Sequence, residues 1–195
     1  MKALPREFYD GCTVDIARAL LGKKLVRTTD EGVTAGYIVE TEAYMGKADP
    51  AAHSYKGMSE RVRVQYGPQG MSYIYMIYGA HYCFNITTGP IGRPEAVLVR
   101  ALEPCEGLEL MEKRRRTTKL FSLCSGPGKL CKAMDITKAQ YGTDLCNIHS
   151  GLYICEGIVP EKTVASKRIN IDYAGEAKDW LWRFTIDGNP HISVK

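Results

Sequence analysis

The sequence predicts a single α+β domain whose strands pair mainly as antiparallel hairpins. The chain has 195 residues, a length typical of one domain with a full hydrophobic core. Two pairs of strand-like runs are each joined by a short segment of turn residues. Helical patterns occur before the first pair and after the second, so helices should flank the sheet.

A helix is expected near the N-terminus. Thr13 can cap its start and Gly22 can end it. Four apolar residues between them fall on one helical face: Ile16, Ala17, Leu20 and Leu21. This segment should therefore pack its apolar face on the core.

The first hairpin is predicted from residues 25–28 and 33–39, joined by turn residues 29–32. Its second arm continues to Tyr44. Because side chains alternate along a strand, Glu40, Glu42 and Tyr44 should share one face. Two carboxylates beside an aromatic ring indicate a polar pocket, although one solvated face of an antiparallel sheet gives the same pattern.

The second hairpin is predicted from residues 73–78 and 82–87. Seven of the twelve tyrosines lie between Tyr44 and Tyr82, which favours stacking surfaces, although tyrosine is also common in strands for structural reasons. Tyr78 has little core to fill at the hairpin tip and should be exposed. Residues 56–70, before this hairpin, are polar and poorly periodic, which predicts a loop with Arg61 among its cations.

Residues 96–102 are nearly continuously apolar and predict a buried strand. Arg100 interrupts them, and a buried guanidinium requires an acidic or polar partner. Glu42 is a candidate partner, and the alternative is that Arg100 reaches solvent at the end of the strand. A helical pattern with Leu108 and Met111 follows this strand.

Ser125 before Pro127 predicts the start of another helix. Its free backbone N–H groups, with Lys129 nearby, could hold one phosphate, but capping without a ligand is the commoner use of such a sequence. The spacing differs from that of a nucleotide triphosphate loop. Towards the C-terminus, residues 168–171 and 181–186 predict two further strands.

Composition and charge limit the functional classes. The hydrophobic fraction of 45% and the charged fraction of 25% are ordinary for a globular protein. No apolar run approaches the roughly 18 residues of a membrane span, and residues 1–5 lack the apolar core of a secretory signal. We therefore expect a soluble, intracellular protein without membrane contact.

The seven cysteines are scattered and odd in number, and reduced thiols are the simplest interpretation. No C-x-x-C pair and no H-E-x-x-H motif occurs, so neither a metal nor another cofactor is expected. The net charge of +4 is mild, but residues 105–140 hold eight Lys or Arg against four acids. The basic run 113–116 within them is either a phosphate-binding surface or a solvated helix end.

Six motifs, in this order, resemble those of the alkyladenine DNA glycosylase family, the 3-methyladenine glycosylases of mammalian type. They are IVETEAY at 38–44 with AAH at 51–53, YMIYG at 75–79 with Asn85, VRALEP at 99–104, SGPGKL at 125–130 and AGE at 174–176. The resemblance extends from about residue 20 to residue 194. Their co-occurrence is far more specific than any one motif. The chain looks like the bacterial members, which lack the long N-terminal extension of the mammalian ones.

The resemblance implies a single mixed domain over residues 1–195, with a curved, mainly antiparallel sheet and a hairpin that projects into the DNA minor groove. It implies that Glu42 activates a hydrolytic water and that Arg100 helps to hold this water. Five residues are then expected to bind the flipped base: Tyr44, His53, Tyr75, Asn85 and Leu98. Asn85 matches the residue that crowds the amino group of guanine.

The resemblance also implies that Tyr78 fills the space that the flipped base leaves, with Arg61 and Lys129 as DNA contacts. Family members usually read Thr-x-Arg-Asn and then Met-Phe in the loop after the histidine, whereas this chain has Ser59-Glu60-Arg61-Val62 and Gln65-Tyr66.

The implied activity is excision of alkylated or deaminated purines such as 3-methyladenine, 7-methylguanine, hypoxanthine and ethenoadenine from double-stranded DNA. The product would be an abasic site in an intact strand, made by a monomer. The enzyme would act in the cytoplasm or nucleoid of a bacterium, the favoured source, or in the nucleus of a eukaryote. The chemistry agrees with the residues, because a carboxylate can stabilise the sugar cation and accept the proton of a water. Two alternatives are a binding module for damaged nucleic acid, which would not need Glu42 and Arg100, and a hydrolase of free nucleosides, which would not need a wedge.

Overall fold

The computed structural model describes residues 2–194. Within this range the chain forms three α-helices, α1 (Thr13–Ala19), α2 (Leu108–Arg115) and α3 (Pro127–Ala133). The strands are β1 (Lys24–Thr29), β2 (Gly32–Tyr44), β3 (Ser72–Ile77), β4 (His81–Thr88), β5 (Glu95–Glu106), β6 (Leu152–Cys155), β7 (Thr163–Ser166) and β8 (Arg183–Ile186). The 3-10 turns are η1 (Arg6–Tyr9), η2 (Gly46–Ala48), η3 (Arg63–Tyr66), η4 (Leu120–Ser122), η5 (Lys138–Gln140), η6 (Ile148–Ser150) and η7 (Asp172–Asp179).

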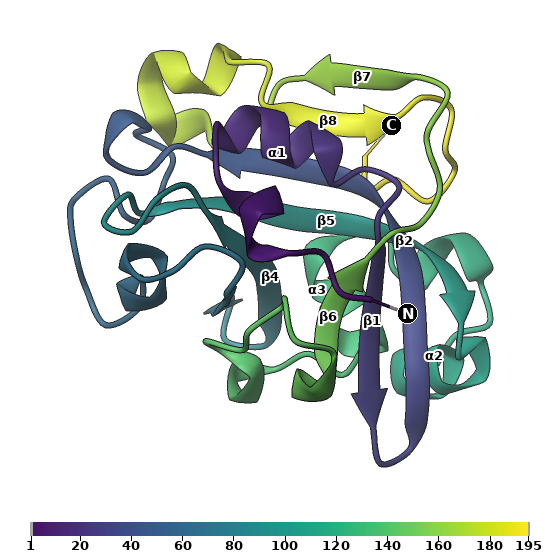
Figure 1. Ribbon diagram of the computed structural model, residues 1–195. Helices are drawn as coiled ribbons and strands as arrows, with labels where there is room; N and C mark the ends of the chain where they lie inside the picture. The colour runs from purple at the N-terminus through teal and green to yellow at the C-terminus, as the bar shows by residue number, and fades with distance from the viewer. Residues whose placement is uncertain (1, 195) are drawn as a thin grey trace.

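All eight strands belong to one sheet with the order β3-β4-β5-β2-β1-β6, to which β8 adds on β2 and β7 adds on β8. The pairs of this sheet are antiparallel. Helices lie beside the sheet, with α1 against β2 and α3 against β4 and β5 (Figure 1). The predicted α+β class with a mainly antiparallel sheet is confirmed.

The long strand β2 organises the sheet. One of its edges pairs with β5, while the other pairs first with β1 and then, from Glu40 to Glu42, with β8. The pairing with β5 shifts register between Ile38 and Thr41, and such bulges bend a strand. Figure 1 shows β2 rising beside β1 and then turning to run below β8, so the predicted curvature is present. The bend lies where β2 pairs with both β5 and β8, and Glu40 and Glu42 are buried there. These acids are therefore not on a solvated face of the sheet.

Both predicted hairpins form. The β1–β2 turn is tight, because Thr29 pairs with Gly32. The β3–β4 hairpin closes with Ile77 opposite His81, which leaves Tyr78 at the tip. Tyr78 is 86% exposed, as predicted, and its backbone has a positive φ of 51°.

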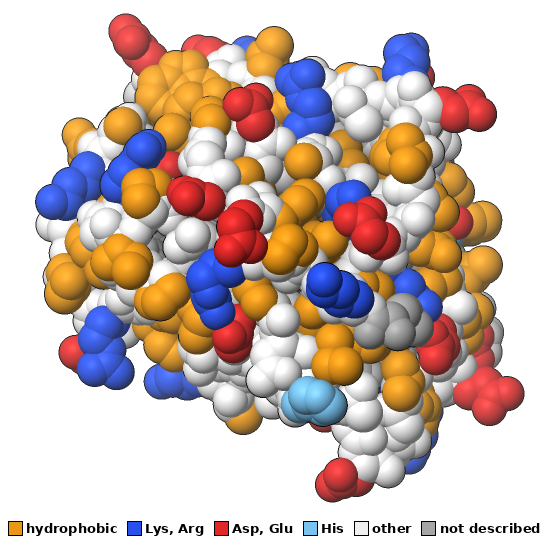
Figure 2. Space-filling view, in the orientation of Figure 1, with side chains coloured by type: hydrophobic (Ala, Val, Ile, Leu, Met, Phe, Trp, Pro, Cys, Tyr) orange, Lys and Arg blue, Asp and Glu red, His pale blue; other side chains and the backbone are white. Residues whose placement is uncertain are grey.

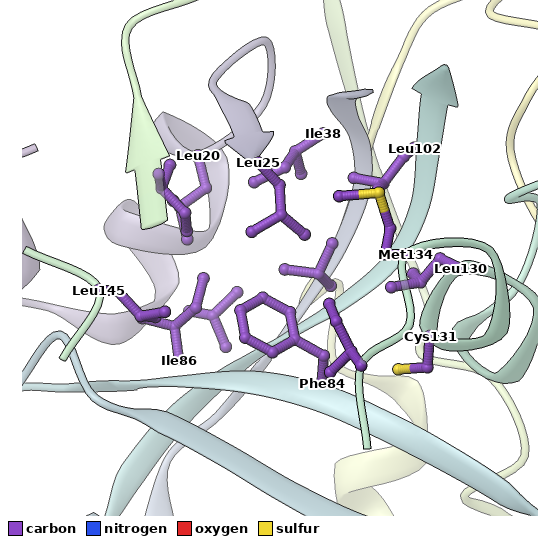
Figure 3. Close-up of a cluster of buried hydrophobic side chains, with 14 of the residues drawn as sticks. Leu20, Leu25, Ile38, Phe84, Ile86, Leu102, Leu130, Cys131, Met134 and Leu145 are labelled. Carbon is purple, nitrogen blue, oxygen red and sulfur yellow. The ribbon is translucent and has the colours of Figure 1, made fainter. Parts of the chain in front are cut away.

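One large hydrophobic cluster lies between the sheet and the helices. Figure 3 shows its side chains converging, with Phe84 and Ile86 of β4 facing Leu25 of β1 and Leu130 of α3 close by. Phe84 and Leu130 are fully buried. This core fixes β4, and with it the register of the β3–β4 hairpin against β5.

Two sequence-based expectations were wrong, and one strand is longer than predicted. Thr13 is the first residue of α1 and does not cap it, because its buried hydroxyl bonds the side chains of Thr88 and Glu95. The buried strand predicted at residues 96–102 is confirmed, and it continues through Pro104 to Glu106. Residues 168–171 are not a strand, because Arg168 is drawn into a buried ion pair, and the strand near them is β7.

No helix within residues 2–194 has the length and apolar character needed to cross a bilayer.

Candidate active site

A cavity of about 260 Å³ opens where the β3–β4 hairpin, β5 and the loop after β2 meet. Segment 169–173, before and at the start of η7, completes its wall. Seven of the residues selected from the sequence line this cavity: Tyr44, His53, Tyr75, Tyr78, Asn85, Leu98 and Arg100. The fold therefore brings residues from four distant parts of the chain to one pocket.

Glu42 is fully buried and lies directly behind the pocket wall. Its Oε2 accepts a hydrogen bond of 2.8 Å from the Tyr44 hydroxyl, and its Oε1 accepts one of 2.8 Å from the backbone N–H of Ile169. The Arg100 Nη1 lies 3.3 Å from the same Oε1. Because all three donor groups belong to pocket-lining residues, the carboxylate is held against the cavity.

Arg100 lies between two buried carboxylates. Its Nε donates to Glu40 Oε1 at 2.9 Å, while its Nη1 faces Glu42. Burial opposes the charged guanidinium, but Glu42 and Glu40 outweigh it and raise the pKa of Arg100. The predicted partner Glu42 is confirmed, and the alternative of a solvent-exposed Arg100 is wrong, since the residue is 8% exposed.

Glu40 is the centre of a second network on the same face of β2. Its Oε1 also accepts from Arg183 Nε at 2.8 Å and from the Ser193 hydroxyl at 2.8 Å. The Ser193 backbone N–H donates to its Oε2. The two acids thus share Arg100, but Glu40 faces the C-terminal segment whereas Glu42 faces the pocket.

Tyr44 forms one wall of the pocket. Burial, and then the negative charge of Glu42, raise the pKa of its phenol well above the usual value. The hydroxyl therefore stays protonated and acts as a donor to Glu42. Its ring remains available for contact with a planar ligand in the cavity.

His53 and Tyr75 meet edge to face, with ring centroids 4.5 Å apart. His53 Nδ1 also shares a hydrogen bond of 2.9 Å with the Tyr73 hydroxyl. Loss of solvation among these rings, together with the nearby Arg61, lowers the pKa of His53 to about 4. His53 is therefore neutral at physiological pH, although part of its side chain stays open to solvent.

Asn85 is 3% exposed and pairs across the sheet with Leu98. Its side-chain nitrogen donates to the carbonyl oxygen of Tyr73 at 3.0 Å. The residue thus has a structural partner in the backbone, and it also lines the pocket.

The predicted DNA contacts lie around the hairpin. The guanidinium carbon of Arg61 lies 4.8 Å from the centre of the Tyr75 ring, so this cation is held beside the pocket. Tyr78 lines both the pocket and a second cavity of about 400 Å³, and three cations also line the second cavity: Arg115, Lys129 and Lys132. Of the basic run 113–116, Lys113 and Arg114 pair with Glu31 at the β1–β2 turn.

Sequence reasoning did not identify several pocket residues. Cys83 could have been found, because it alternates with Asn85 along β4 and lies opposite Tyr75. Gln65, Ile169 and Tyr173 also line the pocket, but they come from irregular segments that give no periodic signal.

Among the described residues, no group of three or more His, Cys, Asp or Glu side chains is placed to hold a metal ion.

Comparison with known proteins agrees with this geometry. Proteins named "Putative 3-methyladenine DNA glycosylase" are 47% identical in Desulfitobacterium hafniense, over the whole of both chains, and 48% identical in Methanocella arvoryzae, over 100% of this chain and 98% of the relative. One from Bacillus licheniformis is 48% identical over 97% of this chain and 96% of the relative. Residues 7–190 match the model of the methylpurine-DNA glycosylase family. The chain belongs to the methylpurine-DNA glycosylase family.

Proposed function

We propose that this protein excises 3-methyladenine and related damaged purines from double-stranded DNA, using a water that Glu42 activates. Its family is one of DNA glycosylases, enzymes that hydrolyse N-glycosidic bonds. The observation that carries the proposal is the buried Glu42 carboxylate, paired with Arg100 and fixed behind an aromatic pocket.

The carboxylate is suited to two tasks. Cleavage of the N-glycosidic bond builds positive charge on the sugar, which a nearby carboxylate stabilises. The same group can accept the proton of the attacking water. A carboxylate has about four acceptor positions, and three donor groups face Glu42, so one position is left for a water.

The pocket is suited to a flat, cationic base. Its volume is slightly below the roughly 300–1,000 Å³ of sites for drug-sized ligands, which suits a single purine. Tyr44, Tyr75 and His53 provide aromatic surfaces, and a cation over such a ring is attracted to it. Neutral His53 adds no repulsion towards the positive charge of an alkylated purine.

Base flipping would bring the damaged nucleotide into this pocket. Unpairing a base costs a few kcal/mol, and the cost is least for a damaged or mispaired base, which contributes to selectivity. Tyr78 would then fill the vacated stack, as wedge side chains of minor-groove binders do. Its exposure at the hairpin tip beside the cavity supports this role. We expect the protein to act as a monomer in the cytoplasm or nucleoid.

The product would be a free base and an abasic site in an intact strand. The described residues that line the pocket include no lysine that could form a Schiff base.

The test compares three substrates at equal concentration: duplex DNA with one 3-methyladenine, the same duplex undamaged, and free 3-methyladenosine. We expect base release from the damaged duplex only, with strand breaks appearing only after alkali or heat. Release from the free nucleoside at a similar rate would indicate a nucleoside hydrolase. Tight binding without release would indicate a binding module.

A further inference from the structure

Arg168 and Asp49 form a buried ion pair behind the pocket. Both side chains are inaccessible to solvent, and two parallel hydrogen bonds join them, Nη1 to Oδ2 at 2.5 Å and Nη2 to Oδ1 at 2.8 Å. Neither residue lines the cavity. Burying such a pair removes two charges from water, so the pair is weak evidence for stabilisation on its own.

The pair joins segments that are far apart in the sequence. Arg168 also donates to the carbonyl oxygens of Ala43, at 2.9 Å, and Ala177, at 3.3 Å. Asp49 accepts from the backbone N–H groups of Met45 and Ala51. The ion pair therefore links three segments by hydrogen bonds: the end of β2, the loop that leads to His53, and η7.

Two of the groups that donate hydrogen bonds to Glu42 belong to residues in contact with, or next to, Arg168. The guanidinium carbon of Arg168 lies 4.7 Å from the centre of the Tyr44 ring, and Tyr44 donates to Glu42 Oε2. The residue after Arg168 is Ile169, whose backbone N–H donates to Glu42 Oε1. The guanidinium carbon of Arg168 also lies 5.2 Å from the centre of the Trp182 ring, a second aromatic contact that limits its movement.

The Nε atom of Arg168 is buried and has no hydrogen-bond partner among the described residues. An unsatisfied buried donor costs stability. The guanidinium therefore lacks one hydrogen bond while it contacts the rings of both Tyr44 and Trp182.

We propose that Arg168 and Asp49 are positioning residues, which hold Tyr44 and Ile169 against Glu42 and so fix the orientation of its carboxylate. This inference rests on the proposed function, and it assigns a role to two residues that contact neither the base nor the sugar. Positioned donors that hold the charged form of a carboxylate also favour that form, so their loss should alter the pH dependence of the reaction.

The test uses single-turnover excision from 3-methyladenine duplex between pH 5 and 9. Arg168→Lys keeps the charge but cannot make the two parallel bonds, and Asp49→Asn keeps the shape. In both variants we expect the rate to fall by about 10²-fold, the effect of roughly 1 Å of misplacement. In Arg168→Lys, which keeps the cation, the acidic limb of the pH profile should also move to higher pH.

Arg168→Lys also leaves unchanged the other charged and titratable groups beside Glu42, among them Arg100, Tyr44 and Tyr173. Asp49→Asn removes a negative charge beside Arg168, so the pH readout is taken from Arg168→Lys. A shift of the acidic limb would therefore report lost hydrogen bonds to the carboxylate.

Lys167→Met provides the matched control. Lys167 is next to Arg168 and forms an exposed pair with Asp179 at 2.7 Å. Breaking this pair should leave both the rate and the pH profile unchanged, because exposed pairs contribute little.

The double variant Asp49→Leu with Arg168→Met separates positioning from stability. An apolar pair of similar size often preserves stability when it replaces a buried ion pair. A folded double variant, verified by thermal unfolding, should be as slow as the single variants. A wild-type rate and pH profile in the folded double variant would overturn the proposal, and so would failure of the double variant to fold, which would assign the pair to stability alone.

The proposed function and this inference fail in different ways. If the wild-type protein releases no base from the damaged duplex, the proposed function is wrong. If the wild type is active and the Arg168 and Asp49 variants match it, only the positioning role is wrong.

Discussion

At the scale of single residues, Glu42 carries the strongest prediction. Glu42→Gln has nearly the same shape, so the pocket and lesion binding should survive. The variant loses the negative charge that faces the sugar and the base that accepts the water's proton. Since positioned general base catalysis alone contributes about 10²–10⁴-fold, single-turnover excision should fall at least by that factor.

Glu40→Gln is the comparison for this experiment. The side-chain oxygen of a glutamine can still accept from Arg100 and Arg183, so Arg100 should keep its place. We expect this variant to lose stability in thermal unfolding more than it loses rate. A Glu42→Gln protein that excised 3-methyladenine at near the wild-type rate would remove Glu42 from the mechanism.

Asn85 should control selectivity between purines. An amide beside the 2-position of the base would clash with the exocyclic amino group that guanine has and adenine lacks. Asn85→Ser should therefore raise excision of 7-methylguanine relative to ethenoadenine. The ratio is measured with single-lesion duplexes. A loss of stability with an unchanged ratio would mean that Asn85 has only a structural role, through its hydrogen bond to the Tyr73 carbonyl oxygen.

His53 should titrate near pH 4 in the folded protein, whereas an unfolded chain would protonate it near 6.5, because loss of solvation and Arg61 lower its pKa to about 4. Between these values the unfolded state binds more protons, so stability is lost as the pH falls from about 6.5 to 4. NMR titration of the His53 ring gives the midpoint directly. In chemical unfolding, His53→Gln should show a smaller loss of stability than wild type over this interval.

At the scale of elements, the β3–β4 hairpin carries the exposed side chain of Tyr78 at its tip. Alanine has a β-carbon, as tyrosine does, so Tyr78→Ala should leave the backbone at the tip, with its positive φ, as it is. The hairpin should therefore keep its shape. Loss of a stacking side chain typically costs about 1–3 kcal/mol of binding. The affinity for lesion duplex should fall accordingly, and an unchanged Kd would show that Tyr78 does not enter the stack.

Local patterns predicted the elements that local interactions build. Both hairpins follow from alternation and turn residues, and α2 and α3 follow from their apolar spacing and Pro127. The missed strands β6 and β7 have four residues each, too few to show a period. Residues 168–171 have strand-like composition, but Asp49, more than a hundred residues away, decides their conformation.

In the active site, too, local patterns predicted some features, and contacts between distant residues determined others. Alternation on β2 placed Glu40 and Glu42 on one face, and the demand of a buried guanidinium for an acid linked Arg100 to Glu42. Glu40 lies closer to Arg100 than Glu42 does. The sequence could not show this, because the arrangement depends on the bulge in β2 and on the contact of Glu40 with Ser193. The role of each acid follows only from which one faces the cavity.

At the scale of the whole molecule, the basic residues are unevenly distributed. The face seen in Figure 2 carries cations and anions interspersed, without a large area of one sign. Beside Tyr78, by contrast, the cavity is lined by Arg115, Lys129 and Lys132, and no acidic residue is among its lining residues. A DNA backbone that follows the hairpin should therefore contact this side.

Binding to undamaged duplex should be electrostatic and fall steeply with salt, because each neutralised phosphate releases counterions and contributes about −0.9 to the slope of log K against log salt. Lys129→Ala should reduce that slope by about one such increment at every sequence tested. Lys113→Ala removes the same charge, but Lys113 pairs with Glu31 at the β1–β2 turn, so its slope should match the wild type. Equal reductions in both variants would mean that net charge alone governs binding. An unchanged slope for Lys129→Ala would place the DNA backbone away from the hairpin.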